Sequence, residues 1–251
     1  MSSFTFFGKV LPERATLDIH APFNVVITTP DGQSLSGKMH ILANQVSITV
    51  KAPSEFDSDL PTLRNYVEES IRAIVDFAGF LYGIGYDYEM ISAINNETGA
   101  MTVFGIQLPV TSDDPEVRAD RFSELLPCLS KSQYLPLALS DLREAIKSPV
   151  DSGVFSFRAA QTIMQAFRKP RESESKGWNR MIKKLNLNKG IKQFMGRYAG
   201  DRRHGKPIHI SWDDRNAMMR RAWVVVDRYC EYLIRGEKAL PKSKFLVPKY
   251  D

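Results

Sequence analysis

Residues 60–81 read LPTLRNYVEESIRAIVDFAGFL, and apolar side chains recur in this stretch at steps of three and four residues. That spacing is typical of a helix with one buried face. The members of the apolar stripe are Leu60, Leu63, Val67, Ile71, Ile74, Ala78 and Leu81. Asp59 can cap the start of this helix, and Pro61 suits its first turn. The stretch therefore predicts one long helix that packs against a core.

Short runs of β-branched and aromatic residues lie on both sides of this helix and predict strands. Before it they are Phe4–Val10, Asn24–Thr29, Ser36–Leu42 and Val46–Lys51, and after it Tyr86–Asn95 and Ala100–Val110. Residues 96–99, Asn-Glu-Thr-Gly, fit the turn of a closing hairpin. We therefore expect an α+β module of mixed strands and helix over residues 1–111.

The second half of the chain has helical periodicity instead. A connecting helix is expected over residues 112–130, because Ser112-Asp-Asp-Pro115 has the composition of a helix start. The further predicted helices are Ser132–Lys147, Asp151 or Ser152 to Arg168, two basic segments at Trp178–Leu187 and Lys189–Tyr198, and Ser211 to Gly236. These elements predict an all-α bundle over residues 131–236, followed by a tail, 237–251, without periodicity.

Charge divides the chain in the same way. Residues 1–125 contain 8 Lys and Arg against 17 Asp and Glu, a net −9, whereas residues 126–251 contain 26 against 12, a net +14. The basic residues are densest between Arg168 and Lys206, with 13 against 3 acidic ones. A polyanion such as RNA is the expected partner of the basic half, because phosphate neutralisation dominates such binding. The alternative is that the acidic half docks on the basic half.

Several kinds of protein are disfavoured by the sequence. Cys128 and Cys230 are far apart and no CxxC occurs, so neither a disulfide framework nor a zinc site is expected. No HExxH, GxSxG or Walker-type loop is present, and we expect no metal and no cofactor. The N-terminus lacks the pattern of a secretory signal, and no stretch has the roughly 18 uninterrupted apolar residues of a membrane span. A cytoplasmic protein is therefore expected.

One segment combines residues suited to chemistry. Residues 197–205 read RYAGDRRHG, so Arg197 is followed at short range by His204 at the peak of basic density. Spacing alone is not informative, because Arg14 and His20 match it as well. The context is more specific, since the segment is expected at the junction of the penultimate and last helices, and Gly205 lets the chain turn there without steric cost.

In this order of helices, and in an arginine and a histidine at that junction, residues 131–236 resemble the HEPN superfamily of helical domains. The resemblance implies metal-independent RNA cleavage by a homodimer. His204 would remove the proton of a ribose 2′-hydroxyl, and Arg197 would stabilise the charge that grows on the phosphate. It also suggests a toxin-like effector in prokaryotic stress or phage defence, controlled by an inhibitory or sensor protein.

Other residues receive supporting roles in this hypothesis. Asp201, Arg203 and Arg158 would support the catalytic pair. RNA or phosphate would be bound by Arg202, Lys206, Lys183, Lys184 and Lys192, with stacking on Trp178 and Tyr198. Each role has a plainer alternative: His204 as a loop histidine, Arg197 as a cation at a helix C-terminus, and Trp178 as a core residue. The alternative function is a non-catalytic interaction and dimerisation module that binds RNA or nucleotide, and a third is a purely structural subunit.

Overall fold

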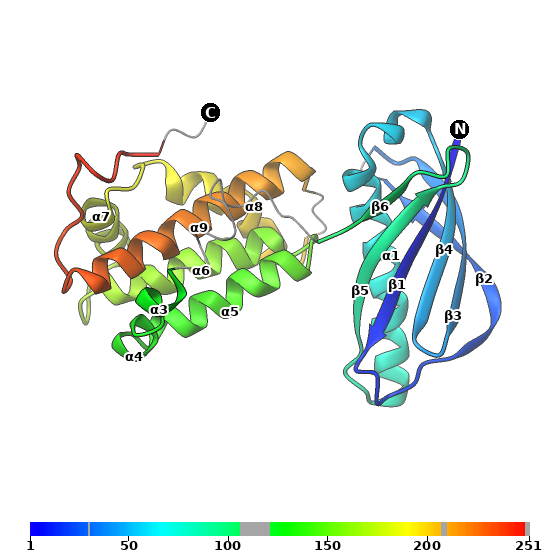
Figure 1. Cartoon of the computed structure of the whole chain (residues 1–251), viewed down its shortest axis with the longest axis horizontal. Coiled ribbons are helices and arrows are strands. Elements are labelled where there is room, and N and C mark those ends of the chain that lie inside the picture. Colours follow the sequence, from blue (N-terminus) through cyan, green and yellow to red (C-terminus); the bar gives the residue numbers. More distant parts are fainter. Residues whose placement is uncertain (30, 106–120, 207–209, 249–251) are drawn as a thin grey trace. The chain divides into compact units, whose positions relative to one another are not determined.

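The structure is a computed structural model, and it describes residues 1–29, 31–105, 121–206 and 210–248, apart from the side chains of Asp201 and Arg203. The chain separates into two compact units, Met1–Gln107 and Leu108–Asp251. The first is a sheet with one long helix and the second is helical, which confirms the α+β prediction (Figure 1). Most of the connecting helix expected at 112–130 lies outside the described residues.

The first unit contains a six-stranded antiparallel sheet in the order β2-β3-β4-β1-β5-β6. The strands are β1 (Ser2–Leu11), β2 (Ile19–Thr28), β3 (Ser34–Leu42), β4 (Gln45–Ala52), β5 (Asp87–Asn95) and β6 (Met101–Val103). All six overlap a predicted strand, and β5 and β6 form the predicted hairpin. A short 3₁₀ turn, η1 (Ser54–Asp57), follows β4.

Helix α1 (Leu60–Tyr82) packs on one face of the sheet, where its apolar stripe meets the inward residues of the strands (Figure 1). Its start is as predicted, because the Asp59 side chain accepts a hydrogen bond from the Thr62 backbone N–H. Between Leu63 and Ala78 the members of the stripe are buried, except Ile74, which is partly buried. Leu81 is 60% exposed, so its predicted burial is wrong. The apolar pattern continues beyond the part of the helix that the sheet covers.

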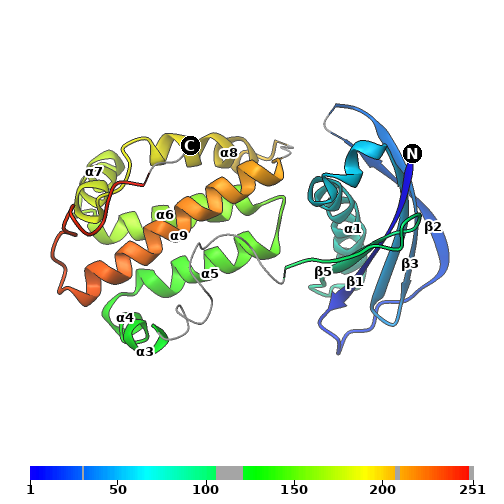
Figure 2. The ribbon, with the colours of Figure 1, turned by 45° about the horizontal axis from the view of Figure 1, so that its top comes forward.

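The second unit contains seven described helices. They are α3 (Phe122–Leu125), α4 (Cys128–Lys131), α5 (Tyr134–Lys147), α6 (Ser152–Phe167), α7 (Glu174–Leu185), α8 (Ile191–Arg203) and α9 (Trp212–Ile234). Helix α6 packs against α5, α7, α8 and α9, so it is the centre of the bundle (Figure 2). Ser211 caps α9 as predicted, since its hydroxyl accepts from the Asp214 backbone N–H.

Buried arginines on α9 hold the other helices in place. Arg215 is 1% exposed and donates to the carbonyl of Ile146 at 2.7 Å, at the end of α5. Arg221 lies with its guanidinium 3.6 Å from the centre of the Phe194 ring on α8. These cations satisfy the carbonyls and aromatic faces of the bundle. Part of the positive charge of the second half is therefore structural.

Arg228 fastens the C-terminal tail to the same bundle. It donates to the carbonyls of Leu185 and Asn186, which end α7, and to the carbonyl of Leu246 in the tail. The Asn186 amide also donates to the carbonyl of Phe245. Phe245 packs against the helical core. Within the described residues, no helix is both long enough and apolar enough to cross a bilayer.

Candidate nucleic-acid interface

Helix α8 carries Arg197, the first residue of the predicted catalytic pair. Ile191, Met195 and Ala199 recur every four residues and are buried, so they form the core-facing side of α8. Arg197 projects from the other side and is exposed. Because α8 runs to Arg203, six residues beyond Arg197, the alternative role of Arg197 as a C-terminal capping cation is wrong.

His204 directly follows the last residue of α8 and is exposed. The seven residues from Arg197 to His204 correspond to about two helical turns, so the two residues share one side of α8 about 10 Å apart along its axis. The prediction that the whole segment is a junction is wrong, because the stripe of Ile191, Met195 and Ala199 keeps it helical. Only His204 stands at the junction, where Gly205 takes the expected left-handed conformation at φ 76°.

Two aromatic rings lie near the Arg197 guanidinium. Its central carbon lies 5.9 Å from the centre of the Phe194 ring and 6.0 Å from that of Tyr198. Tyr198 is half-buried, and burial is the main cause that raises the pKa of its hydroxyl. A hydrogen bond to Asp214, in the first turn of α9, raises that pKa further, and Arg197 lowers it. Tyr198 therefore links α8 to α9, and its predicted role as an open stacking platform does not fit this position.

Comparison with family models assigns both units. Residues 4–104 match the N-terminal domain of "Domain of unknown function (DUF8168)", and residues 122–234 match its C-terminal domain. The chain carries both DUF8168 domains. Comparison with curated proteins and with solved structures gave no match. Any functional conclusion for the DUF8168 C-terminal domain therefore depends on the geometry of its own residues.

Two arginines that were predicted to support the site form ion pairs within the DUF8168 C-terminal domain. Arg202 donates from Nε to Asp151, which precedes α6, at 2.8 Å. Arg158 on α6 donates from Nε to Asp141 on α5, also at 2.8 Å. Both cations thus have a carboxylate partner within the domain, and their assignment to RNA or to the catalytic pair stays a prediction. Asp201 and Arg203 are in the last turn of α8, and their side chains are outside the description.

Trp178 is the clearest correction among the predicted binding residues. It is 1% exposed and stacks on Phe157, with ring centres 5.9 Å apart and planes inclined by 14°. An indole in this position is inside the core between α6 and α7 and cannot stack on a base. The plainer alternative, a core tryptophan, is the one observed.

The predicted lysines differ in exposure. Lys183 and Lys206 are exposed, whereas Lys184 and Lys192 are half-buried on α7 and α8. Sequence reasoning did not select Lys189, which is exposed before α8, or Lys242 in the tail. Both lie with Lys183 around one groove. Lys189 could have been found from the local charge density, but Lys242 could not, because it is brought there by the fold of the tail.

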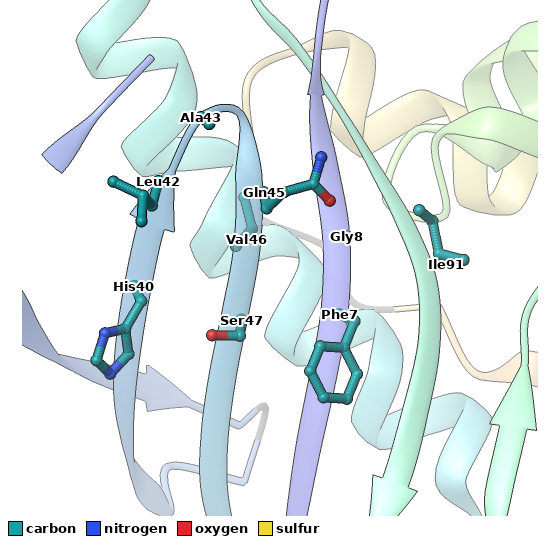
Figure 3. A pocket seen from close by; sticks show the side chains of 9 residues that line it. All are labelled: Phe7, Gly8, His40, Leu42, Ala43, Gln45, Val46, Ser47 and Ile91. Carbon is teal, nitrogen blue, oxygen red and sulfur yellow. The ribbon is translucent and has the colours of Figure 1, made fainter. Parts of the chain in front are cut away.

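The DUF8168 N-terminal domain has a shallow pocket of its own, of about 650 Å³, on the sheet face opposite α1 (Figure 3). Phe7, Ser47 and His40 stand side by side there on β1, β4 and β3, as the strand register requires. No acidic side chain lines the pocket to orient His40, so this arrangement lacks the third group of a hydrolytic triad. Within the described part of the chain, no group of three or more His, Cys, Asp or Glu side chains could hold a metal ion.

Proposed function

We propose that the DUF8168 C-terminal domain binds RNA, and that Arg197 and His204 on the solvent-facing side of α8 contact its phosphates. The observation that carries this proposal is the exposure of both residues on one side of the helix, while the neighbouring Arg202 is paired with Asp151. No acid whose side chain is described forms an ion pair with Arg197. A guanidinium in this position is suited to phosphate, with which it forms paired, charge-assisted hydrogen bonds.

The salt dependence of binding tests this proposal. For single-stranded nucleic acid, the slope of log affinity against log salt is about −0.7 for each phosphate that a cation neutralises. Replacing Arg197 with Gln should therefore reduce the magnitude of the slope by about 0.7. Lys51→Gln is the matched control, since it removes one exposed charge from β4 in the other domain. An Arg197→Gln slope equal to that of wild type would refute the contact.

A second candidate function is metal-independent RNA cleavage at the same two residues. It is favoured by the exposed imidazole of His204, which no described residue engages by a hydrogen bond, and by the resemblance to the HEPN superfamily. In this mechanism the neutral imidazole takes the proton of a ribose 2′-hydroxyl. The oxygen then attacks the adjacent phosphate, and the bond between phosphorus and the 5′-oxygen breaks. The leaving 5′-oxygen takes a proton from solvent, to which the imidazolium returns its own, so the products are a 2′,3′-cyclic phosphate and a 5′-hydroxyl end. Arg197 stabilises the additional negative charge.

Cleavage is tested with a labelled single-stranded RNA in the presence of EDTA. His204→Ala and Arg197→Ala should each abolish production of the cyclic phosphate, without changing the circular dichroism spectrum or the melting temperature. Binding by His204→Ala should persist, because the arginine and lysine contacts remain. If both variants cut as fast as wild type, the activity belongs elsewhere, and wild type that binds without cutting leaves the domain a binding module.

A further inference from the structure

A groove of about 750 Å³ lies where α7 ends, and the C-terminal tail forms one side of it. Its charged lining consists of Lys183 from α7, Lys189 from the segment before α8 and Lys242 from the tail. Ile182, Leu187 and Val247 supply its apolar lining. Among the described residues that line it, none is acidic. The groove therefore combines cations with an apolar surface, without a carboxylate to compete for the cations.

The tail side of the groove is held firmly. Arg228 and Asn186 bind the carbonyls of Leu246 and Phe245, and the Leu240 backbone N–H donates to the carbonyl of Lys184 at 2.9 Å. These bonds position Lys242 and Val247 across from α7. Because its two sides are fixed before a ligand arrives, the groove is preorganised, which reduces the entropic cost of binding.

We propose that this groove binds one nucleotide of a single-stranded RNA, with the base against Ile182, Leu187 and Val247 and the phosphate held by the three lysines. A nucleotide has the two properties that the lining requires, a flat apolar face and an adjacent anion. The exposed amide of Asn179, which also lines the groove, can donate to or accept from a base edge. The proposal rests on the RNA binding proposed above, and it adds a site separate from Arg197 and His204.

The position of the groove relative to α8 supports one continuous strand. Lys189 lies two residues before the start of α8, and Arg197 lies six residues after Ile191, or about 9 Å of helical rise. An RNA strand that leaves the groove along the exposed side of α8 therefore reaches Arg197 first and His204 next. Electrostatic tracking of a backbone beside sites that hold individual bases is a common mode of single-strand binding.

The test uses the full chain and a fluorescent eight-nucleotide oligouridylate, with its abasic counterpart, free UMP and inorganic phosphate as further probes. The triple variant Lys183→Gln, Lys189→Gln, Lys242→Gln should reduce the magnitude of the salt slope by about 0.7, because one phosphate is no longer neutralised. The matched triple control is Arg14→Gln, Lys38→Gln, Lys51→Gln, which removes the same charge from exposed positions of the N-terminal domain. An unchanged slope in the groove variant would overturn the proposal.

The base contact has a separate readout. Wild type should bind the oligouridylate about tenfold more tightly than the abasic strand, and Val247→Asp should remove most of that preference. Equal binding of the two strands by wild type would overturn the base contact and with it the nucleotide site. UMP should displace the oligouridylate from wild type more effectively than inorganic phosphate does. If inorganic phosphate displaces it as effectively as UMP, the base contact is overturned.

The two proposals fail separately. If the groove variant loses affinity while Arg197→Gln retains the wild-type slope, the groove stands and the α8 contact falls. If Arg197→Gln alone changes the slope, the α8 contact stands and the groove falls. Wild type without affinity for any of these probes at low salt overturns both.

Discussion

At the scale of single residues, the arginines of the basic half divide into two kinds. Arg158 and Arg202 pair with Asp141 and Asp151, and Arg215 and Arg228 donate to backbone carbonyls. A count of positive charge cannot separate these paired or carbonyl-bound cations from ones such as Arg197, for which no described carboxylate forms an ion pair. The structure makes the separation because it shows which side chains meet a carboxylate or a helix end. The proposed RNA contacts therefore involve few residues, mainly Arg197, His204, Lys183, Lys189 and Lys242.

The two cysteines give a residue-scale prediction. Burial raises the pKa of Cys230 from its ordinary value of 9.0 to about 12, and burial also raises the pKa of Cys128. Because only the thiolate is a nucleophile, the folded protein should be alkylated by iodoacetamide very slowly between pH 7 and 9. A raised thiol pKa means that the folded state disfavours the thiolate. The contribution of the buried thiols to the free energy of unfolding is therefore complete below pH 9 and declines as the pH rises above it.

Mass spectrometry after timed alkylation measures the rate at which Cys128 and Cys230 are modified. Unfolding in guanidinium should expose both thiols to modification within the same interval in which the native protein stays unmodified. Rapid labelling of native protein at pH 8 would contradict the buried environment of α4 and α9.

At the scale of elements, helix ends were the most predictable feature and helix continuity the least. The caps at Asp59 and Ser211 were read correctly, because capping chemistry is local to three residues. The sequence does not predict the continuation of α8 from Tyr198 to Arg203, because Gly200 and Asp201 have weak helix propensity. What keeps α8 helical is the burial of Ile191, Met195 and Ala199 against α6, a tertiary effect.

Candidate site residues were predictable to a similar extent. Arg197, His204 and Lys183 are exposed, as their predicted binding roles require. Trp178, in contrast, is buried, and Arg202 is paired with Asp151. In a helix as short as α7, the spacing of apolar residues does not show whether a tryptophan lies on the buried or on the exposed face. Lys242 joins Lys183 only because the tail folds back on α7, which no periodicity in residues 237–251 indicates.

The tail anchor gives an element-scale prediction. Arg228→Met removes a buried guanidinium that satisfies three carbonyls, at the ends of α7 and in the tail. Hydrogen bonds to charged groups contribute about 1.5–3 kcal/mol each, and the freed carbonyls of α7 remain buried. The free energy of unfolding, measured by urea denaturation, should therefore fall by about 2–4 kcal/mol. Limited proteolysis should also cut the variant after Gly236, where wild type resists. Lys238→Met, an exposed substitution nearby, should change neither measurement. A resistant tail in Arg228→Met would show that Phe245 packing alone is sufficient.

At the scale of the whole molecule, the two DUF8168 domains differ in fold, charge and the kind of surface that they present. In the N-terminal domain, the sheet face opposite α1 carries Phe7 and Leu42, which are exposed, whereas the helical domain presents cations. The candidate contacts of the proposed RNA site all belong to the helical unit. We expect the isolated C-terminal unit to retain the RNA affinity of the full chain.

The cleavage hypothesis makes a prediction about assembly. Within one chain, Arg197 and His204 are about 10 Å apart along α8, whereas a phosphate under attack must be reached by both groups at once. A symmetric homodimer that brings two α8 helices together antiparallel removes this separation, because Arg197 of one subunit then meets His204 of the partner subunit. Mixing the Arg197→Ala and His204→Ala variants, each inactive alone, should then restore about a quarter of wild-type cleavage, since half of the dimers are mixed and each holds one complete site. Activity is measured after the subunits have exchanged, and light scattering establishes the dimer. If the mixture remains inactive although the subunits exchange, both groups act within one chain or not at all, and the shared site is refuted.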